Sequence, residues 1–120
     1  MSHVVTIATQ ITSRSALESA CSKLGLAAPV DGVARLYSGA TARGTLVNLP
    51  DWTYPVVLDL ATGTGRYDNY GGIWGKQAEL DRLNQRYSAE VLYEQAYAQG
   101  HRVLGEEVGV DGELLLTIEA

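Results

Sequence analysis

Residues 52–98 read WTYPVVLDLATGTGRYDNYGGIWGKQAELDRLNQRYSAEVLYEQAYA, and they say more about the fold than any other stretch of this chain. They hold both tryptophans and six of the seven tyrosines, set among glycines just ahead of a long polar run. Large aromatic side chains are costly to leave in water. The stretch must therefore form either a packing unit that defines the fold or a binding surface.

Its first half predicts two paired strands. The run Val56-Val57-Leu58 within residues 55–60 is typical of a central, buried strand. A turn over residues 62–65 follows, after which residues 66–70 are expected to pair back as a hairpin. Its second half predicts a helix over residues 76–99, because strong helix formers dominate there. The apolar face of that helix carries Leu80, Leu83, Tyr87 and Val91.

The helical pattern drifts after Ser88, which predicts a bend at that point, and Gly100 ends the helix. Upstream, alternation over residues 3–11 predicts a half-buried strand. Thr12 or Ser13 is then expected to cap a first helix, with Ser15 and Glu18 as a second possible capping pair. Gly25 is the expected end of that helix.

Three further segments complete the predicted order of elements. Residues 32–37 and 45–49 are short strand candidates, and residues 101–108 and 113–119 predict a closing hairpin around the Asp111-Gly112 turn. The order strand, helix, strands, helix, two strands predicts one α+β domain over residues 1–120. Its sheet is expected to be mostly antiparallel, with both helices on one face.

Composition limits the class of protein. The net charge is −5, and all of it lies in residues 61–120, which carry five basic and ten acidic side chains. An acidic surface argues against nucleic-acid binding, which would need an arginine patch. Cys21 is the single cysteine, the start of the chain has no signal-peptide pattern, and no apolar run approaches the roughly 20 residues of a membrane span. We therefore expect a cytoplasmic protein that contacts no membrane.

Motifs for chemistry are weak. Gly75-Lys76 opens a helix as in a phosphate-binding loop, but Tyr70 and Gln77 stand where that loop needs Gly and Ser or Thr. His3, His101 and Cys21 have no metal-ligand spacing, and Cys21 lies on an apolar helix face, where buried thiols are inert. We expect no catalytic residue, no metal and no cofactor.

A polar-aromatic tetrad, Tyr67-Asp68-Asn69-Tyr70, is the strongest candidate for recognition. The two carboxyl and amide side chains could contact a ligand beside the stacked tyrosines, or they could bond their own backbone while the tyrosines cover the core. We favour the second interpretation. Asp59 is the one acid among apolar residues, and a strand-end cap or a salt bridge with an Arg is its expected role. Arg82 and Arg86, flanked by Glu79 and Glu90, are expected to form ion pairs on a solvated helix face.

Several of these segments together resemble the hypothetical chloroplast reading frame thirty-five family, a domain of unknown function found in plastids, bacteria and phages. The matching pieces are Met1-Ser2-His3 with Thr6-Ile7, residues 52–57, Tyr67–Gly72 with Trp74-Gly75, Gln85–Tyr87 with Glu90, Gly100, and Asp111-Gly112. Ser88, where the family favours Ala, and the closing residues 114–119 depart from the pattern. The form of the two middle blocks is similar to the bacterial and phage branch.

The resemblance implies an accessory role beside an AAA-type ATPase, and no activity. We therefore expect a small, non-catalytic interaction or adaptor module that binds a protein, either such an ATPase or itself as a homo-oligomer. If phage-encoded, it would act in the host cytoplasm. The alternative is a small-molecule-binding protein or enzyme with a pocket near Tyr67–Tyr70. The candidate binding residues are Trp52, Tyr54, Tyr67, Asp68, Asn69, Tyr70, Trp74 and Arg86.

Overall fold

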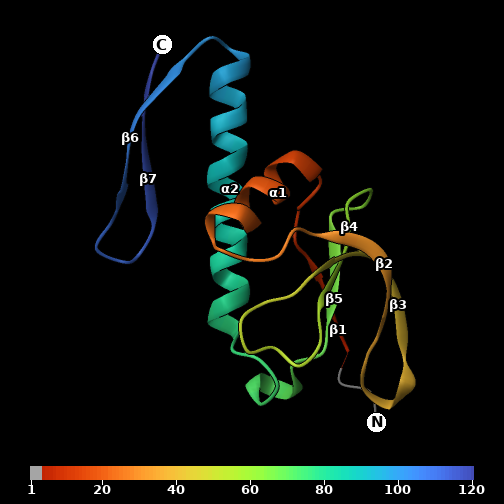
Figure 1. Ribbon diagram of the computed structural model, residues 1–120. Coiled ribbons are helices and arrows are strands. Elements are labelled where there is room, and N and C mark those ends of the chain that lie inside the picture. The colour runs from red at the N-terminus through yellow and green to blue at the C-terminus, as the bar shows by residue number, and fades with distance from the viewer. Residues whose placement is uncertain (1–3) are drawn as a thin grey trace.

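The computed structural model describes residues 4–120 and has the predicted α+β architecture (Figure 1). A five-stranded antiparallel sheet has the order β1-β5-β4-β3-β2. Its strands are β1 (Val5–Ala8), β2 (Val30–Arg35), β3 (Thr41–Val47), β4 (Val56–Asp59) and β5 (Thr64–Tyr67). The run Val56-Val57-Leu58 thus forms the middle strand, as predicted. His3 and the opening Met1-Ser2-His3 lie outside the described residues.

Two helices cover one face of this sheet. Helix α1 (Arg14–Lys23) is capped by Ser13, whose Oγ accepts a hydrogen bond from Ala16 N at 3.2 Å. Gly25 follows its end with φ +73°, which glycine adopts without strain. The predicted second capping pair is wrong, because Ser15 bonds Glu94 instead. Helix α2 (Gln77–Ala98) runs as one helix through Ser88, so the predicted bend is also wrong.

The main core lies between the helices and the sheet. Leu17, Ala20, Leu80 and Leu83 pack against Val56 and its neighbours, and all five are fully buried. The ring of Tyr87 packs in the same core, and its hydroxyl group makes hydrogen bonds. Its Oη accepts hydrogen bonds from the backbone N of Thr12 and of Ser13, both at 3.0 Å. These bonds fasten the start of α1 to the middle of α2. A smaller apolar cluster around Val57 covers the opposite face of the sheet.

The closing hairpin forms, but it stays separate from the main sheet. Strands β6 (Arg102–Val108) and β7 (Leu114–Glu119) make a two-stranded antiparallel sheet of their own, hereafter the C-terminal hairpin. It lies against α2 on the side away from the five-stranded sheet, so α2 separates the two sheets (Figure 1). Two 3₁₀ turns, η1 (Tyr37–Gly39) and η2 (Tyr70–Gly72), complete the elements. The molecule is elongated, with extents of 51 × 30 × 22 Å.

Candidate functional site

The aromatic residues singled out by sequence pack mainly on one another. Trp74 stacks on Tyr70 with ring centroids 4.7 Å apart, and Tyr54 meets its edge at 5.7 Å. Tyr37, from the distant β2–β3 connection, lies 5.0 Å from the same indole. Trp52 packs edge-on against Tyr67 at 5.6 Å. These contacts tie three loops and the end of β5 together.

Hydrogen bonds fix the same aromatic unit. Trp52 Nε1 donates to the Lys76 carbonyl at 3.0 Å, and Thr53 N donates to the Trp74 carbonyl at 2.8 Å. Gly75 is needed here, because a Cβ on it would lie 2.6 Å from Trp52 Cε2 and closer still to two other indole atoms. Trp52 and Thr53, two residues of the predicted binding surface, therefore join the segment before β4 to the residues just before α2.

A ligand site would need the polar side chains of the tetrad to be accessible, but most of the tetrad is buried. Tyr67, Asp68 and Asn69 are buried, and only Tyr70 is exposed. Asn69 donates through Nδ2 to the Gly75 carbonyl at 3.2 Å, so its expected backbone bonding is found. Neither carboxylate oxygen of Asp68 has a hydrogen-bond partner among the described residues. The prediction that the side chain bonds nearby backbone is therefore wrong for Asp68.

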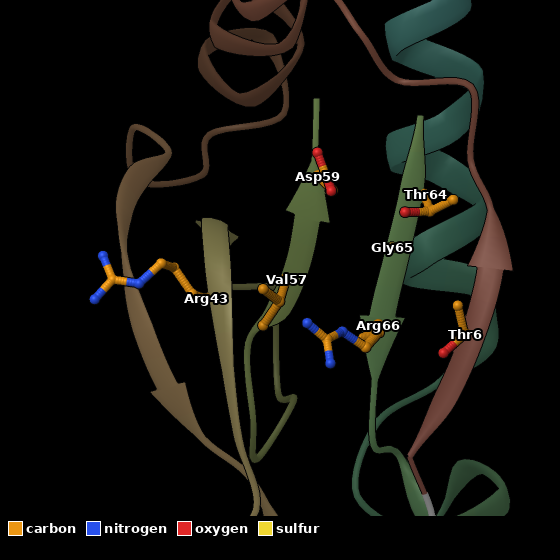
Figure 2. A pocket seen from close by; sticks show the side chains of 7 residues that line it. All are labelled: Thr6, Arg43, Val57, Asp59, Thr64, Gly65 and Arg66. Atoms are coloured by element: carbon orange, nitrogen blue, oxygen red, sulfur yellow. The ribbon is translucent and has the colours of Figure 1, made fainter. Parts of the chain in front are cut away.

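Tyr67–Tyr70 line none of the five main hollows on the described surface. One hollow of about 310 Å³ lies on the sheet face away from the helices, between β4 and β5 (Figure 2). Arg66 extends toward Val57 there, whereas Arg43 extends away from both (Figure 2). Asp59 stands at its edge, and its Oδ1 accepts Ala61 N at 3.0 Å, the predicted strand-end cap. The side chains that line this hollow are mostly polar, namely Thr6, Arg43, Asp59, Thr64 and Arg66 beside Val57.

Arg86 lies apart from the aromatic unit, on the side of α2 that faces the C-terminal hairpin. Its guanidinium makes two bonds to Glu106 of β6, Nη1 to Oε1 at 2.6 Å and Nη2 to Oε2 at 2.8 Å. It also contacts Glu90 one helical turn away, at 2.9 Å. Only 11% of its side chain is exposed. The ion pair with Glu90 was predicted, and Arg82 forms its predicted pair with Glu79 on an exposed part of the helix, but Arg86 itself is not solvated, because the hairpin covers it.

A network of charges surrounds this contact. Glu90 is 3% exposed and is shared between Arg86 and Lys23 of α1, whose Nζ lies 2.9 Å from Oε2. Tyr93 donates its hydroxyl to Glu106 at 2.7 Å, and Lys23 lies over the Tyr93 ring. Hydrogen bonds from Arg86 and then Tyr93 lower the pKa of Glu106 from 4.5 to about 2. The network joins α1, α2 and β6 around one buried carboxylate.

The C-terminal hairpin is otherwise loosely seated. Gln85 Nε2 donates to the Gly112 carbonyl at 2.6 Å near its turn. Between these two attachments a hollow of about 290 Å³ separates α2 from Leu114 and Leu116. Large apolar side chains remain exposed along the hairpin, namely Leu104, Val108, Val110, Leu115 and Ile118. Val110 is fully exposed, at 101%. Leu92 and Tyr97 are further exposed apolar side chains on α2.

Arg66 shares no surface with Arg82 and Arg102 among residues 4–120. Arg82 and Arg102 are paired with Glu79 and Glu119, and Arg66 lies on the far sheet face. Among residues 4–120, no three His, Cys, Asp or Glu side chains gather closely enough to hold a metal ion. No helix in the same range is long and apolar enough to cross a membrane. Comparison of the chain with protein-family models, curated proteins and solved structures found no match.

Proposed function

We propose that the protein is a non-catalytic interaction module that binds another polypeptide through the C-terminal hairpin and the adjoining end of α2. The observation that supports this is the apolar surface of the hairpin, where Leu104 is 57% and Val108 70% exposed on a two-stranded sheet. A sheet of two strands is marginal in water unless a further surface covers it. Contiguous exposed apolar residues on a soluble protein commonly mark such a surface.

The recognition mode that suits this surface is strand addition. A two-stranded sheet presents backbone donors and acceptors on its outer edges, and a partner strand satisfies them while its side chains cover the apolar faces. The network of Arg86, Glu90 and Glu106 holds the hairpin against α2 on the side away from the five-stranded sheet, so its outer face and edges are open to a partner. An AAA-type ATPase is the partner that the sequence resemblance suggests, and a second copy is the other.

The test compares two double variants that remove exposed aliphatic side chains without adding charge. Leu104→Gln/Leu115→Gln changes the hairpin, and Val30→Gln/Val33→Gln changes two exposed valines on β2 as the matched control. Each tagged protein is incubated with lysate of its source cells, and captured proteins are quantified by mass spectrometry. We expect the hairpin variant to lose most of the capture that the control retains. Equal capture by both folded variants would remove the hairpin from the proposed function.

A further inference from the structure

Four strand edges are without a pairing partner among residues 4–120, and they differ in protection. Edge strands avoid pairing with other chains when they are short, charged or bulged. β1 is only four residues long. β2 carries Asp31, Gly32 and Arg35 within its six residues. Both free edges of the main sheet are therefore protected.

The two edges of the C-terminal hairpin contrast sharply. β6 carries three charged residues, Arg102, Glu106 and Glu107, and its register is interrupted between Val103 and Gly105. β7 runs from Leu114 to Ile118 with no charge, glycine or proline, and its own residues are not bulged. Its only charged residue is Glu119, at the end. Of the four described edges, β7 alone lacks every form of protection.

We propose that β7 pairs antiparallel with β7 of a second copy of this chain, so that two hairpins form one four-stranded sheet. This inference rests on the proposed function and names its partner. In a dimer with a twofold axis the same surface of each copy contacts the other, so one apolar strand edge can pair with itself. Such dimers are the commonest oligomers. Pairing also converts a marginal two-stranded sheet into one of four strands.

Charge selects the register. A twofold axis perpendicular to the sheet must pass between a residue and its own copy. Centring the pairing on Leu116 would place Glu113 of one copy directly opposite Glu119 of the other, which is unfavourable. Centring it on Thr117 avoids this, because Leu116 then lies opposite Ile118 and Glu119 opposite Leu115. It also brings the two Thr117 side chains together, a favoured cross-strand pair.

The two copies meet on the outward-facing side at Thr117. In the hairpin this residue lies opposite Gly105, and its side chain is exposed. Leu114 and Leu116 point the other way, toward α2, where they line the hollow described above. Since the axis preserves the faces of the sheet, both α2 helices lie on one side of it.

Two variants at Thr117 test the interface with a matched control at the same position. Thr117→Lys places like charges opposite each other at the axis, whereas Thr117→Val keeps the shape and adds no charge. We expect the wild type and Thr117→Val to show twice the monomer mass of 12.9 kDa in light scattering at high concentration. Thr117→Lys should weaken dimerisation by about tenfold or more, because the change occurs in both copies. A dimer that is unaffected by Thr117→Lys would exclude this edge.

Cysteine variants test which edge is used. In the proposed sheet the two Thr117 Cα atoms are about 5 Å apart, within disulfide reach. The two β6 strands are about 14 Å apart, three strand spacings, which is too far. Thr117→Cys should therefore form a disulfide-linked dimer under mild oxidation, and Glu107→Cys should not. The native Cys21 is buried and does not interfere. Crosslinking through Glu107→Cys alone would assign the interface to β6 and overturn the proposal.

A strictly monomeric wild type would also overturn the proposal. Capture from lysate then separates the two ideas. If Leu104→Gln/Leu115→Gln still abolishes capture, the interaction module stands with a different protein as its partner. If capture is unaffected as well, both the self-pairing and the proposed function fail.

Discussion

Arg86 and Glu106 form a bidentate pair, with N···O distances of 2.6 and 2.8 Å, that fastens the C-terminal hairpin to helix α2. Two parallel hydrogen bonds between a guanidinium and a carboxylate are stronger and more directional than a simple ion pair. The pair is also only partly open to water, since Arg86 is 11% and Glu106 28% exposed. Because few other contacts hold the hairpin, its position depends strongly on these two residues.

Replacing Glu106 should loosen the hairpin while leaving the rest of the fold intact. Glu106→Gln retains the shape but removes the charge that Arg86 and Tyr93 bind, which costs about 1–2 kcal/mol of local stability. Hydrogen exchange of amides in residues 102–119 should then be about tenfold faster, because exchange there follows local opening. Glu107→Gln, one residue away and without an ion pair among residues 4–120, is the control. Equal exchange in both variants would contradict the role given to Glu106.

Acid should release the hairpin in the same way. The pKa of Glu106 is lowered from 4.5 to about 2, so its charged form is favoured in the folded state. Its contribution is fully present above about pH 4.5 and is lost as the pH falls through about 2. Amide exchange in residues 102–119, measured against pH and corrected for intrinsic rates, should show this loss. Glu106→Gln should lack that step; a step of the same size in the variant would assign it to other carboxylates.

Gly75 should not tolerate even a methyl group. In Gly75→Ala the new Cβ would meet the Trp52 indole, and the shift needed to relieve this contact costs about 1–3 kcal/mol. Gly105→Ala is the control, because nothing lies within 4 Å of its Cβ position. Thermal unfolding monitored by tryptophan fluorescence measures both. A Gly75→Ala protein as stable as Gly105→Ala would show that the aromatic unit is loosely packed.

Local patterns in the sequence predicted the elements well, because their causes are local. The Ser13 cap, the Gly25 end and the apolar face of Leu80, Leu83 and Tyr87 follow from neighbours within one or two turns. The middle position of Val56–Asp59 agrees with its unbroken apolar run, because such a run is buried where both faces of the sheet are covered.

Contacts between distant residues were not predictable in this way. Alternation in β7 shows that Leu114, Leu116 and Ile118 share a face, but it does not say which surface that face meets. Nothing in the sequence near Arg86 indicates Glu106, 20 positions further on, so the arginine was assigned to a solvated helix face. The burial of Asp68 was missed for the same reason: turn chemistry explains an Asx residue at a strand end just as well. The spacing of charged and aromatic residues along the chain therefore predicted neither the contact between Arg86 and Glu106 nor the burial of Asp68.

Tyr87 should contribute through its hydroxyl as well as its ring. Tyr87→Phe keeps the ring in the core but leaves Thr12 N and Ser13 N without their shared acceptor, which costs about 1–3 kcal/mol. Tyr97→Phe, at a site 66% exposed, should change the free energy of unfolding very little. Urea unfolding compares the two. If both variants are equally stable, water takes the place of the Tyr87 hydroxyl as the acceptor for these two backbone groups, and the prediction is wrong.

Removing the charge of Asp68 should make the protein more stable. Its carboxylate is 1% exposed, and neither oxygen has a hydrogen-bond partner among residues 4–120. A charge buried without a partner opposes folding, and a neutral amide of nearly the same shape is less costly to bury. Asp68→Asn should therefore raise the free energy of unfolding at neutral pH by about 1–3 kcal/mol, measured by urea denaturation. Glu107→Gln, which changes an exposed carboxylate, is the control. Destabilisation by Asp68→Asn alone would mean that the folded protein gives this carboxylate a favourable partner, and would contradict this prediction.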